Sequence, residues 1–320
     1  MGSSSDWADM DLLLRRSIDG GRTWEPIKII AKRRKGEPTS NATPIVDRNG
    51  TIHLLFQRDY ANAYYTRSVD DGVTWSEPKD LTYAFETFRP EYDWKVLAPG
   101  PGHSIQLKSG RLLVPVWLSD PEKTEPKRGH RPSVIGTIYS DNSGETWHRG
   151  DIVVNDPSIL KNPSETMAVQ LEDGRVMLNI RNESEEQRRA VSYSPNGISD
   201  WTEISFDEEL FEPVCMASII RHPGGEGSKE LLLFSNPDSR DLPDHPRKNL
   251  TLKVSRDEGK SWSHQKVLDS GTSGYSDLAV GPNGLIYCLY ETNTVKEGWN
   301  YSLVLKKFNK EWLFNEDPQP

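Results

Sequence analysis

Hydrophobic residues in this chain recur in short runs, and where a period is visible it is two. In the segment 250–255, Leu-Thr-Leu-Lys-Val-Ser, every second residue is apolar, which is typical of a strand that buries one face. Similar strand-like runs occur at 51–57, 112–118, 134–140, 175–181, 231–236, 286–291 and 302–308. Since no segment keeps a helical period beyond a turn or two, the pattern predicts an all-β protein with almost no helix.

Turn signals separate these runs. Asp47-Arg-Asn-Gly50 and Pro282-Asn-Gly284 each bring Gly and Asn between two strand-like runs, as hairpins do, because these residues adopt positive φ at little cost. Hairpin follows hairpin with no obvious linker. We therefore expect a single domain over 1–313, followed by a C-terminal tail at 314–320.

A short phrase is repeated around some of the turns. The pattern S-x-[DN]-x-G-x-[ST]-W begins at Ser17, Ser68, Ser140 and Ser255, and a degenerate copy spans 192–201. An Asp or Asn side chain accepts bonds from nearby backbone N–H groups and so folds a turn. We interpret the acids of these turns as structural. Repetition of one phrase along the chain, starting at Ser17, Ser68, Ser140 and Ser255, is typical of a propeller, whose radial sheets leave only short edges.

Composition narrows the function more than the fold. Only 34% of the 320 residues are hydrophobic, and ten Trp and eleven Tyr add bulk. A net charge of −9 argues against a nucleic-acid surface, so any anionic substrate needs a local group of cations.

Cys215 and Cys288 lie in apolar stretches without metal-ligand spacing. We expect no metal, no cofactor and no membrane span. The segment 1–5 has no signal-peptide core, and the compartment is not predicted.

Six segments resemble the exo-sialidases (neuraminidases), six-bladed propellers whose repeated turns are called Asp boxes. The matching segments are 5–17, 94–107, 162–182, 247–255, 273–278 and 289–291. The resemblance extends over almost the whole chain. It implies a six-bladed propeller and an activity on sialylated glycans, glycoproteins or glycolipids.

The resemblance also implies three catalytic roles. Asp6 falls at the position of the general acid and base, Tyr275 at that of the nucleophile, and Glu165 at that of the base beside it. The chemistry accounts for these residue types. Sialic acid carries a carboxylate on the carbon that is attacked, so a neutral hydroxyl avoids the repulsion that a carboxylate nucleophile meets. Tyr has an ordinary pKa near 10, so it needs an adjacent base.

Substrate contacts are implied in the same way. Arg181 and Arg247 match arginines that hold the substrate carboxylate by charge-assisted, often bidentate bonds. Glu291 matches a glutamate that braces an arginine of that cluster. Asn41 falls where the family contacts the polar edge of the sugar, and His103 lies in the segment that resembles the family's glycine-rich loop and is assigned to substrate binding as well.

Each assignment leaves a structural alternative open. The arginines can be surface residues, Tyr275 can pack a blade edge, and Glu165 can be solvated in its turn. Asp6 has Asp9 and Asp11 as acidic neighbours. The loop of His103 is rich in Gly and Pro, so its imidazole can instead form a structural hydrogen bond.

The chain departs from the family at its start. Sialidases usually begin with an Arg-Ile-Pro phrase about two dozen residues before the acid–base Asp, and Asp6 leaves no room for it. The pairs Arg89-Pro90 and Arg131-Pro132 lie downstream and do not fit. We expect that an N-terminal segment is missing, that the first blade is incomplete, and that carboxylate binding is weakened.

Three functions fit these observations. The sequence favours a retaining exo-α-sialidase with a Tyr nucleophile. A non-catalytic sialoglycan-binding propeller is the first alternative, and a structural Asp-box platform for protein interaction is the second. The joint occurrence of Glu165, Arg181, Arg247 and Tyr275 in family order disfavours the platform. Linkage preference, the sialic acid variant and oligomeric state are not predicted.

Overall fold

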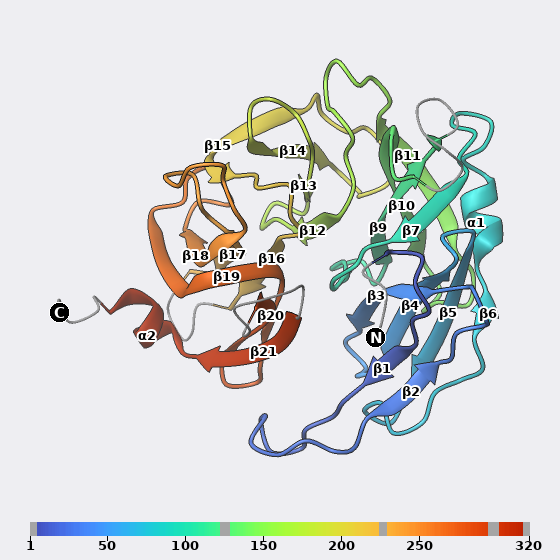
Figure 1. Ribbon diagram of the computed structural model, residues 1–320, viewed down its shortest axis with the longest axis horizontal. Helices are drawn as coiled ribbons and strands as arrows, with labels where there is room; N and C mark the ends of the chain where they lie inside the picture. The colour runs from blue at the N-terminus through green and yellow to red at the C-terminus, as the bar shows by residue number, and fades with distance from the viewer. Residues whose placement is uncertain (1–4, 122–128, 224–228, 294–300, 316–320) are drawn as a thin grey trace.

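A computed structural model describes residues 5–121, 129–223, 229–293 and 301–315. The strands form antiparallel sheets arranged in a ring (Figure 1). The first sheet pairs β1 (Leu12–Leu14) with β2 (Lys28–Ala31). The second runs β3 (Thr39–Val46), β4 (Ile52–Arg58), β5 (Asn62–Ser68) and β6 (Lys79–Asp80). The third contains β7 (Val96–Pro99), β9 (Leu112–Ser119), β10 (Ser133–Ser140) and β11 (His148–Val154), with β8 (Ile105–Gln106) also on β9.

The second half of the chain continues the ring. The fourth sheet runs β12 (Thr166–Gln170), β13 (Val176–Ile180), β14 (Arg188–Ser194) and β15 (Ser205–Phe211). The last runs β16 (Ser218–His222), β17 (Leu231–Pro237), β18 (Lys248–Ser255), β19 (His264–Val280), β20 (Ile286–Asn293) and β21 (Tyr301–Phe308). Two short helices, α1 (Thr82–Glu86) and α2 (Lys310–Phe314), are the only α-helices among the described residues.

Strand β19 belongs to two blades. Its residues 264–272 pair with β18, and its residues 273–280 pair with β20. The six-stranded sheet is therefore two blades that share one long strand. With the two-stranded first sheet as a partial blade, the ring has six units, and the predicted all-β propeller is confirmed.

Each Asp box forms the turn that its sequence predicts. In the box between β10 and β11, Gly144 N–H donates to Ser140 Oγ at 2.9 Å and Thr146 N–H donates to Asn142 Oδ1 at 2.9 Å. The degenerate copy keeps this scheme in a loop one residue shorter, where Gly197 N–H donates to Ser194 Oγ at 2.9 Å. The boxes join the third and fourth strands of their sheets, so β1 and β2 occupy the outer positions of the first blade.

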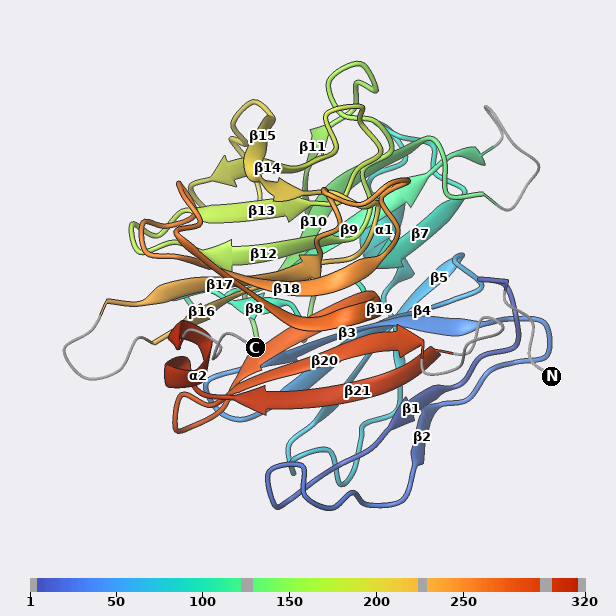
Figure 2. The same ribbon diagram turned by 60° about the vertical axis from the view of Figure 1, so that its left-hand side comes forward.

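The box glycines also close the ring. A Cβ added to Gly144 would lie 2.3 Å from Tyr65 Oη, and one added to Gly197 would lie 2.6 Å from Leu113. Both contacted residues belong to the preceding sheet. The glycine of the first box, Gly21, faces Leu305 of β21, so the first unit packs on the last (Figure 2). Each box is thus both a turn and a contact between neighbouring blades.

Apolar side chains fill the spaces between the blades. Between the last two blades, buried Leu250 of one blade packs together with Leu278 and Tyr290 of the next and with Leu313 of α2. The expected boundary at 313 stays a prediction, because residues 316–320 lie outside the described part of the chain.

Candidate active site

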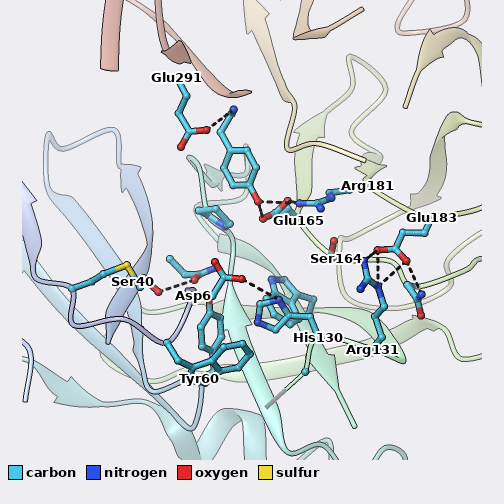
Figure 3. Close-up of a pocket in the computed structure, with 18 of the residues that line it drawn as sticks. Asp6, Ser40, Tyr60, His130, Arg131, Ser164, Glu165, Arg181, Glu183 and Glu291 are labelled. Atoms are coloured by element: carbon cyan, nitrogen blue, oxygen red, sulfur yellow. Dashed lines mark hydrogen bonds and ion pairs between the residues drawn. The ribbon is translucent and has the colours of Figure 1, made fainter. Parts of the chain in front are cut away.

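A cavity of about 700 Å³ opens on the ring, and the strands bring most of the predicted site residues to it. Seven of the predicted residues line it: Asp6, Asn41, Glu165, Arg181, Arg247, Tyr275 and Glu291. They come from segments up to 285 positions apart (6 to 291). Figure 3 shows Glu165 and Arg181 on one side of the cavity and Asp6 near His130 on another.

Glu165 and Arg181 are neighbours because of one strand pairing. Glu165 directly precedes β12 and Arg181 directly follows β13, and the antiparallel register aligns Thr166 with Ile180 at that end. Arg181 Nη1 donates to a carboxylate oxygen of Glu165. The hairpin therefore holds the carboxylate of Glu165 and the guanidinium of Arg181 side by side at its open end.

Tyr275 enters this pair from β19. Its hydroxyl donates to the second carboxylate oxygen of Glu165, and Arg181 Nη1 donates to the phenol oxygen at 3.0 Å. Burial, followed by the negative charge of Glu165, raises the pKa of Tyr275 well above its usual range. Burial opposes the charge of Arg181, but the Glu165 carboxylate outweighs it and raises the pKa of the guanidinium. The phenol is thus neutral and the guanidinium charged.

Arg247 completes a cationic frame around the phenol ring. Its guanidinium carbon lies 5.8 Å from the ring centroid of Tyr275, and that of Arg181 lies 6.0 Å from the same centroid. Arg247 Nη2 donates to the carbonyl of Val214, whose φ of 55° is in the left-handed region. Such a conformation at a β-branched residue costs about 1–3 kcal/mol and is concentrated at functional sites.

Glu291 holds the backbone of the Tyr275 segment. Its carboxylate accepts the Tyr275 N–H at 3.0 Å. A Cβ on Gly274 would come within 2.4 Å of this carboxylate, which is why a glycine precedes the tyrosine. Burial raises the pKa of Glu291, against the effects of the Tyr275 N–H and of Arg247. Among the described residues, no arginine forms an ion pair with it, so its expected brace of an arginine stays a prediction.

Asp6 lies in a different environment. Its side chain is 63% exposed, and one of its carboxylate oxygens lies 3.8 Å from His130 Nδ1. Asn41 lines the same cavity, and its φ of 57° is left-handed. The Asn41 side-chain oxygen accepts a bond from Ser40 Oγ at 3.1 Å. The acid position is therefore open, whereas the tyrosine position is closed.

His103 is not brought to this cavity. Its Nδ1 lies 2.6 Å from Asp277 Oδ1, and its backbone N–H donates to Asp277 Oδ2 at 3.0 Å. Ser218 Oγ donates to the same carboxylate at 3.0 Å. Burial opposes the charge of His103, but Asp277 outweighs it and raises the pKa of His103. The geometry favours the structural alternative for this histidine.

The sequence reasoning missed several residues of the cavity wall. Arg131, which did not fit the family spacing, lines the cavity and pairs with Glu183 through Nε at 2.8 Å. Four further additions are aromatic: Trp7, Tyr60, Trp117 and His130. Aromatic content alone did not distinguish them from core residues, because only the packing brings them to one place.

A buried ion pair supports the arginine segments from behind. Arg189 and Glu212 have side chains 0% and 1% exposed and lie 2.6 Å apart. Glu212 also accepts the N–H groups of Asn182 and Cys215, at 3.3 and 3.0 Å. These residues directly follow Arg181 and Val214, so the pair fixes both ends of the cationic frame. Burial raises the pKa of Glu212 and lowers that of Arg189.

The described residues contain neither a metal-ligand cluster nor a membrane helix. Within 5–121, 129–223, 229–293 and 301–315, no group of three His, Cys, Asp or Glu side chains is arranged to hold a metal ion. No helix in the same ranges is both long and apolar enough to cross a membrane.

Comparisons with known proteins agree with the fold and the repeats. The BNR repeat-like domain model matches residues 2–288. The sialidase of Micromonospora viridifaciens is 31% identical over 335 residues, covering 94% of this chain and 47% of the relative. The sialidase of Bacteroides fragilis (strain YCH46) is 29% identical over 327 residues, covering 89% of this chain and 54% of the relative.

A solved structure is also similar. The Hadza microbial sialidase Hz136 matches with a TM-score of 0.76 and 29% identity, covering 95% of this chain and 60% of that chain. The chain spans about half the length of the two bacterial relatives. Because the family model covers residues 2–288 and these relatives are sialidases, the chain belongs to the BNR repeat-like domain family, among the sialidases.

Proposed function

We propose that this chain is a retaining exo-α-sialidase that removes terminal sialic acids from glycans, with Tyr275 as the nucleophile. One observation carries the proposal: the Tyr275 hydroxyl donates to Glu165 while two guanidinium groups lie within about 6 Å of its ring. A half-buried phenol in contact with a base, framed by cations, suits attack on a carbon that bears a carboxylate.

In the first step, Tyr275 Oη bonds to the anomeric carbon as the glycosidic C–O bond breaks. Glu165 accepts the phenol proton, and protonated Asp6 gives its proton to the leaving oxygen. Because burial and Glu165 raise the Tyr275 pKa, a free phenolate is disfavoured. Proton transfer therefore accompanies attack.

In the second step, water replaces the tyrosine. Asp6, now a carboxylate, takes a proton from the water, and the water oxygen bonds to the anomeric carbon. The bond to Tyr275 breaks, and Glu165 returns the proton to the phenol. The sum is a sialoside plus water giving sialic acid and an alcohol, with every side chain restored. Two displacements retain the configuration at the anomeric carbon.

Arg181 and Arg247 hold the substrate carboxylate in both steps. Arg181 Nε is buried and lacks a hydrogen-bond partner among the described residues. An unmet charged donor beside a cavity supports an anionic ligand, because leaving such a donor unpaired is costly.

The test is hydrolysis of a fluorogenic sialoside by residues 1–320, with Tyr275→Phe as the matched control. We expect slow turnover by the unsubstituted chain, because its carboxylate binding is expected to be weakened, and loss of that turnover in Tyr275→Phe, with both proteins folded. Binding of sialic acid without turnover would support the non-catalytic sialoglycan-binding alternative. Equal turnover in both proteins would refute the proposed nucleophile.

A further inference from the structure

The turn that carries Asp6 lies on the wall of the cavity, and the chain just beyond it is tied to the following segment, where Gly36 N–H donates to Asp9 Oδ1 at 3.1 Å and Thr39 N–H donates to the Met10 carbonyl at 3.0 Å. Within the turn, Ala8 N–H donates to the Ser5 carbonyl at 2.9 Å and Trp7 N–H donates to Ser5 Oγ at 3.2 Å. The distance of 3.8 Å from Asp6 to His130 Nδ1 is too long for a hydrogen bond. Something other than the carboxyl group must therefore set the position of Asp6.

The next residue provides that contact. The ring of Trp7 lies 4.8 Å from that of His130 and 5.1 Å from that of Tyr60, centroid to centroid. Tyr60 and His130 lie 5.0 Å apart, and Trp117 lies 5.1 Å from His130. These distances are within the range of about 4.5–7 Å that aromatic pairs prefer. Four rings from four separate segments thus form one cluster, which we call the aromatic clamp.

The far side of the clamp is rigid. Tyr60 is 6% and Trp117 is 4% exposed, and the Trp117 indole N–H donates to the Gly100 carbonyl at 3.2 Å. Tyr60 occupies the turn between β4 and β5, and Trp117 lies within β9. The Asp6 turn is therefore docked on two sheets through the side chain of Trp7.

The charges around His130 are compatible with a packing role. The acidic groups that face it are Asp6 and Glu165, and the basic ones are Arg181 and Arg131, with the phenol of Tyr60 against its ring. Burial dominates these charges and lowers the pKa of His130. Its Nε2 is buried without a hydrogen-bond partner among the described residues. A neutral imidazole can pack as a ring against Trp7 and Tyr60.

We propose that Trp7, seated in the aromatic clamp, is the positioning residue of the acid–base carboxyl of Asp6. This inference rests on the proposed function. The clamp then affects one step only, protonation of the leaving group, and does not affect attack by Tyr275.

Leaving-group dependence tests the clamp. The sugar leaving group of 3′-sialyllactose needs protonation, whereas the phenol of a 4-nitrophenyl sialoside departs with little help. We expect Trp7→Ala to lower kcat/KM for 3′-sialyllactose by about 10²-fold, as a displacement near 1 Å does. For the aryl sialoside we expect a loss below about fivefold, and Asp6→Asn should show the same split. Trp312→Ala, a half-buried tryptophan on α2, should change neither rate.

Each other outcome overturns the inference. Equal losses on both substrates, or no loss, would make Trp7 a merely structural residue. If Asp6→Asn shows no split, Asp6 is not the acid and the clamp has nothing to position. If Trp7→Ala does not fold, Trp7→Leu replaces it, and the same split between the two substrates is expected.

The test also separates this inference from the proposed function. If the unsubstituted chain hydrolyses neither sialoside, both proposals fail. If it hydrolyses both and Trp7→Ala loses them in proportion, only the clamp fails.

Discussion

The two carboxylates of the candidate site are held in opposite ways. Glu165 is 8% exposed and is bonded to both Arg181 and Tyr275 at the end of a hairpin. The side chain of Asp6 is 63% exposed, and its carboxylate lies 3.8 Å from His130 Nδ1, too far for a hydrogen bond. One belongs to the sheets of the ring, and the other to a short turn docked on them.

The difference matches the role that the proposed mechanism gives to each carboxylate, Glu165 as base and Asp6 as acid. A base that assists a nucleophile works over a narrow range of geometry, so it gains from a rigid, buried site. An acid that protonates a leaving group must admit many different alcohols from the solvent side. In the proposed mechanism, the sheets would therefore fix the geometry of the attack, whereas side-chain packing on a separate turn would fix that of the protonation.

The largest expected effect is a loss of activity when the buried carboxylate, Glu165, is replaced. Glu165→Gln should lower kcat by about 10²–10⁴-fold for both sugar and aryl sialosides, because the base acts in every attack. Steady-state kinetics with the two substrates measures this. A loss confined to 3′-sialyllactose would mean that Glu165, rather than Asp6, serves the leaving group, and the comparison would be broken.

The next largest effect is a loss of stability when the buried ion pair behind Arg181, Arg189–Glu212, is broken. Arg189→Met should lower the free energy of unfolding by about 3–5 kcal/mol, because it leaves Glu212 buried without its partner. Urea denaturation measures it. The double variant Arg189→Met/Glu212→Met is the control and should recover part of the loss. A single-variant loss below about 1 kcal/mol would contradict the role of this pair as a support.

A pH-dependent contribution should come from the His103–Asp277 pair. The raised pKa of His103 stabilises the fold below its ordinary value near 6.5, and this contribution is lost as pH rises through the higher folded pKa. Burial opposes the charge of Asp277, but His103 outweighs it, and the lowered pKa of Asp277 stabilises the fold above about pH 4. Asp277→Asn should thus cost about 1.5–3 kcal/mol at pH 5–6 and less at pH 9.

Unfolding midpoints of the unsubstituted chain and of Asp277→Asn, measured from pH 5 to pH 9, test this window. A difference that grows with pH would reverse the sign and refute the pair as a charged contact.

The smallest expected effect is on the free energy of unfolding when the exposed carboxylate, Asp6, is removed, and an Asp-box variant provides the contrast. Asn142→Ala should cost about 1 kcal/mol of unfolding free energy, because it removes the acceptor of the Thr146 N–H in an Asp box. Asp6→Ala should change that free energy by less than about 0.5 kcal/mol, as an exposed substitution. Thermal unfolding of both variants measures the contrast. A larger cost for Asp6→Ala would show that Asp6 helps to hold the turn.

Local pattern was sufficient for the turns and the strands. The Asp-box phrase states its own hydrogen bonds, because donor and acceptor lie within four residues, as between Asn142 and Thr146. The alternation at 250–255 likewise predicted β18. Glu165, Arg181 and Tyr275 were selected by resemblance, and the fold brings them together. His103 was selected in the same way, but it pairs with Asp277.

By itself, the sequence determined an all-β ring of hairpins, the turns that join them, and a set of charged and phenolic residues suited to an anionic sugar. Only the tertiary structure decided which of these residues meet. The contact of Tyr275 with Glu165 depends on β19 changing partner after residue 272. The clamp depends on Trp7 reaching rings more than 50 and 100 positions away, at Tyr60 and His130. Such contacts arise from blade packing, and no local period or motif encodes them.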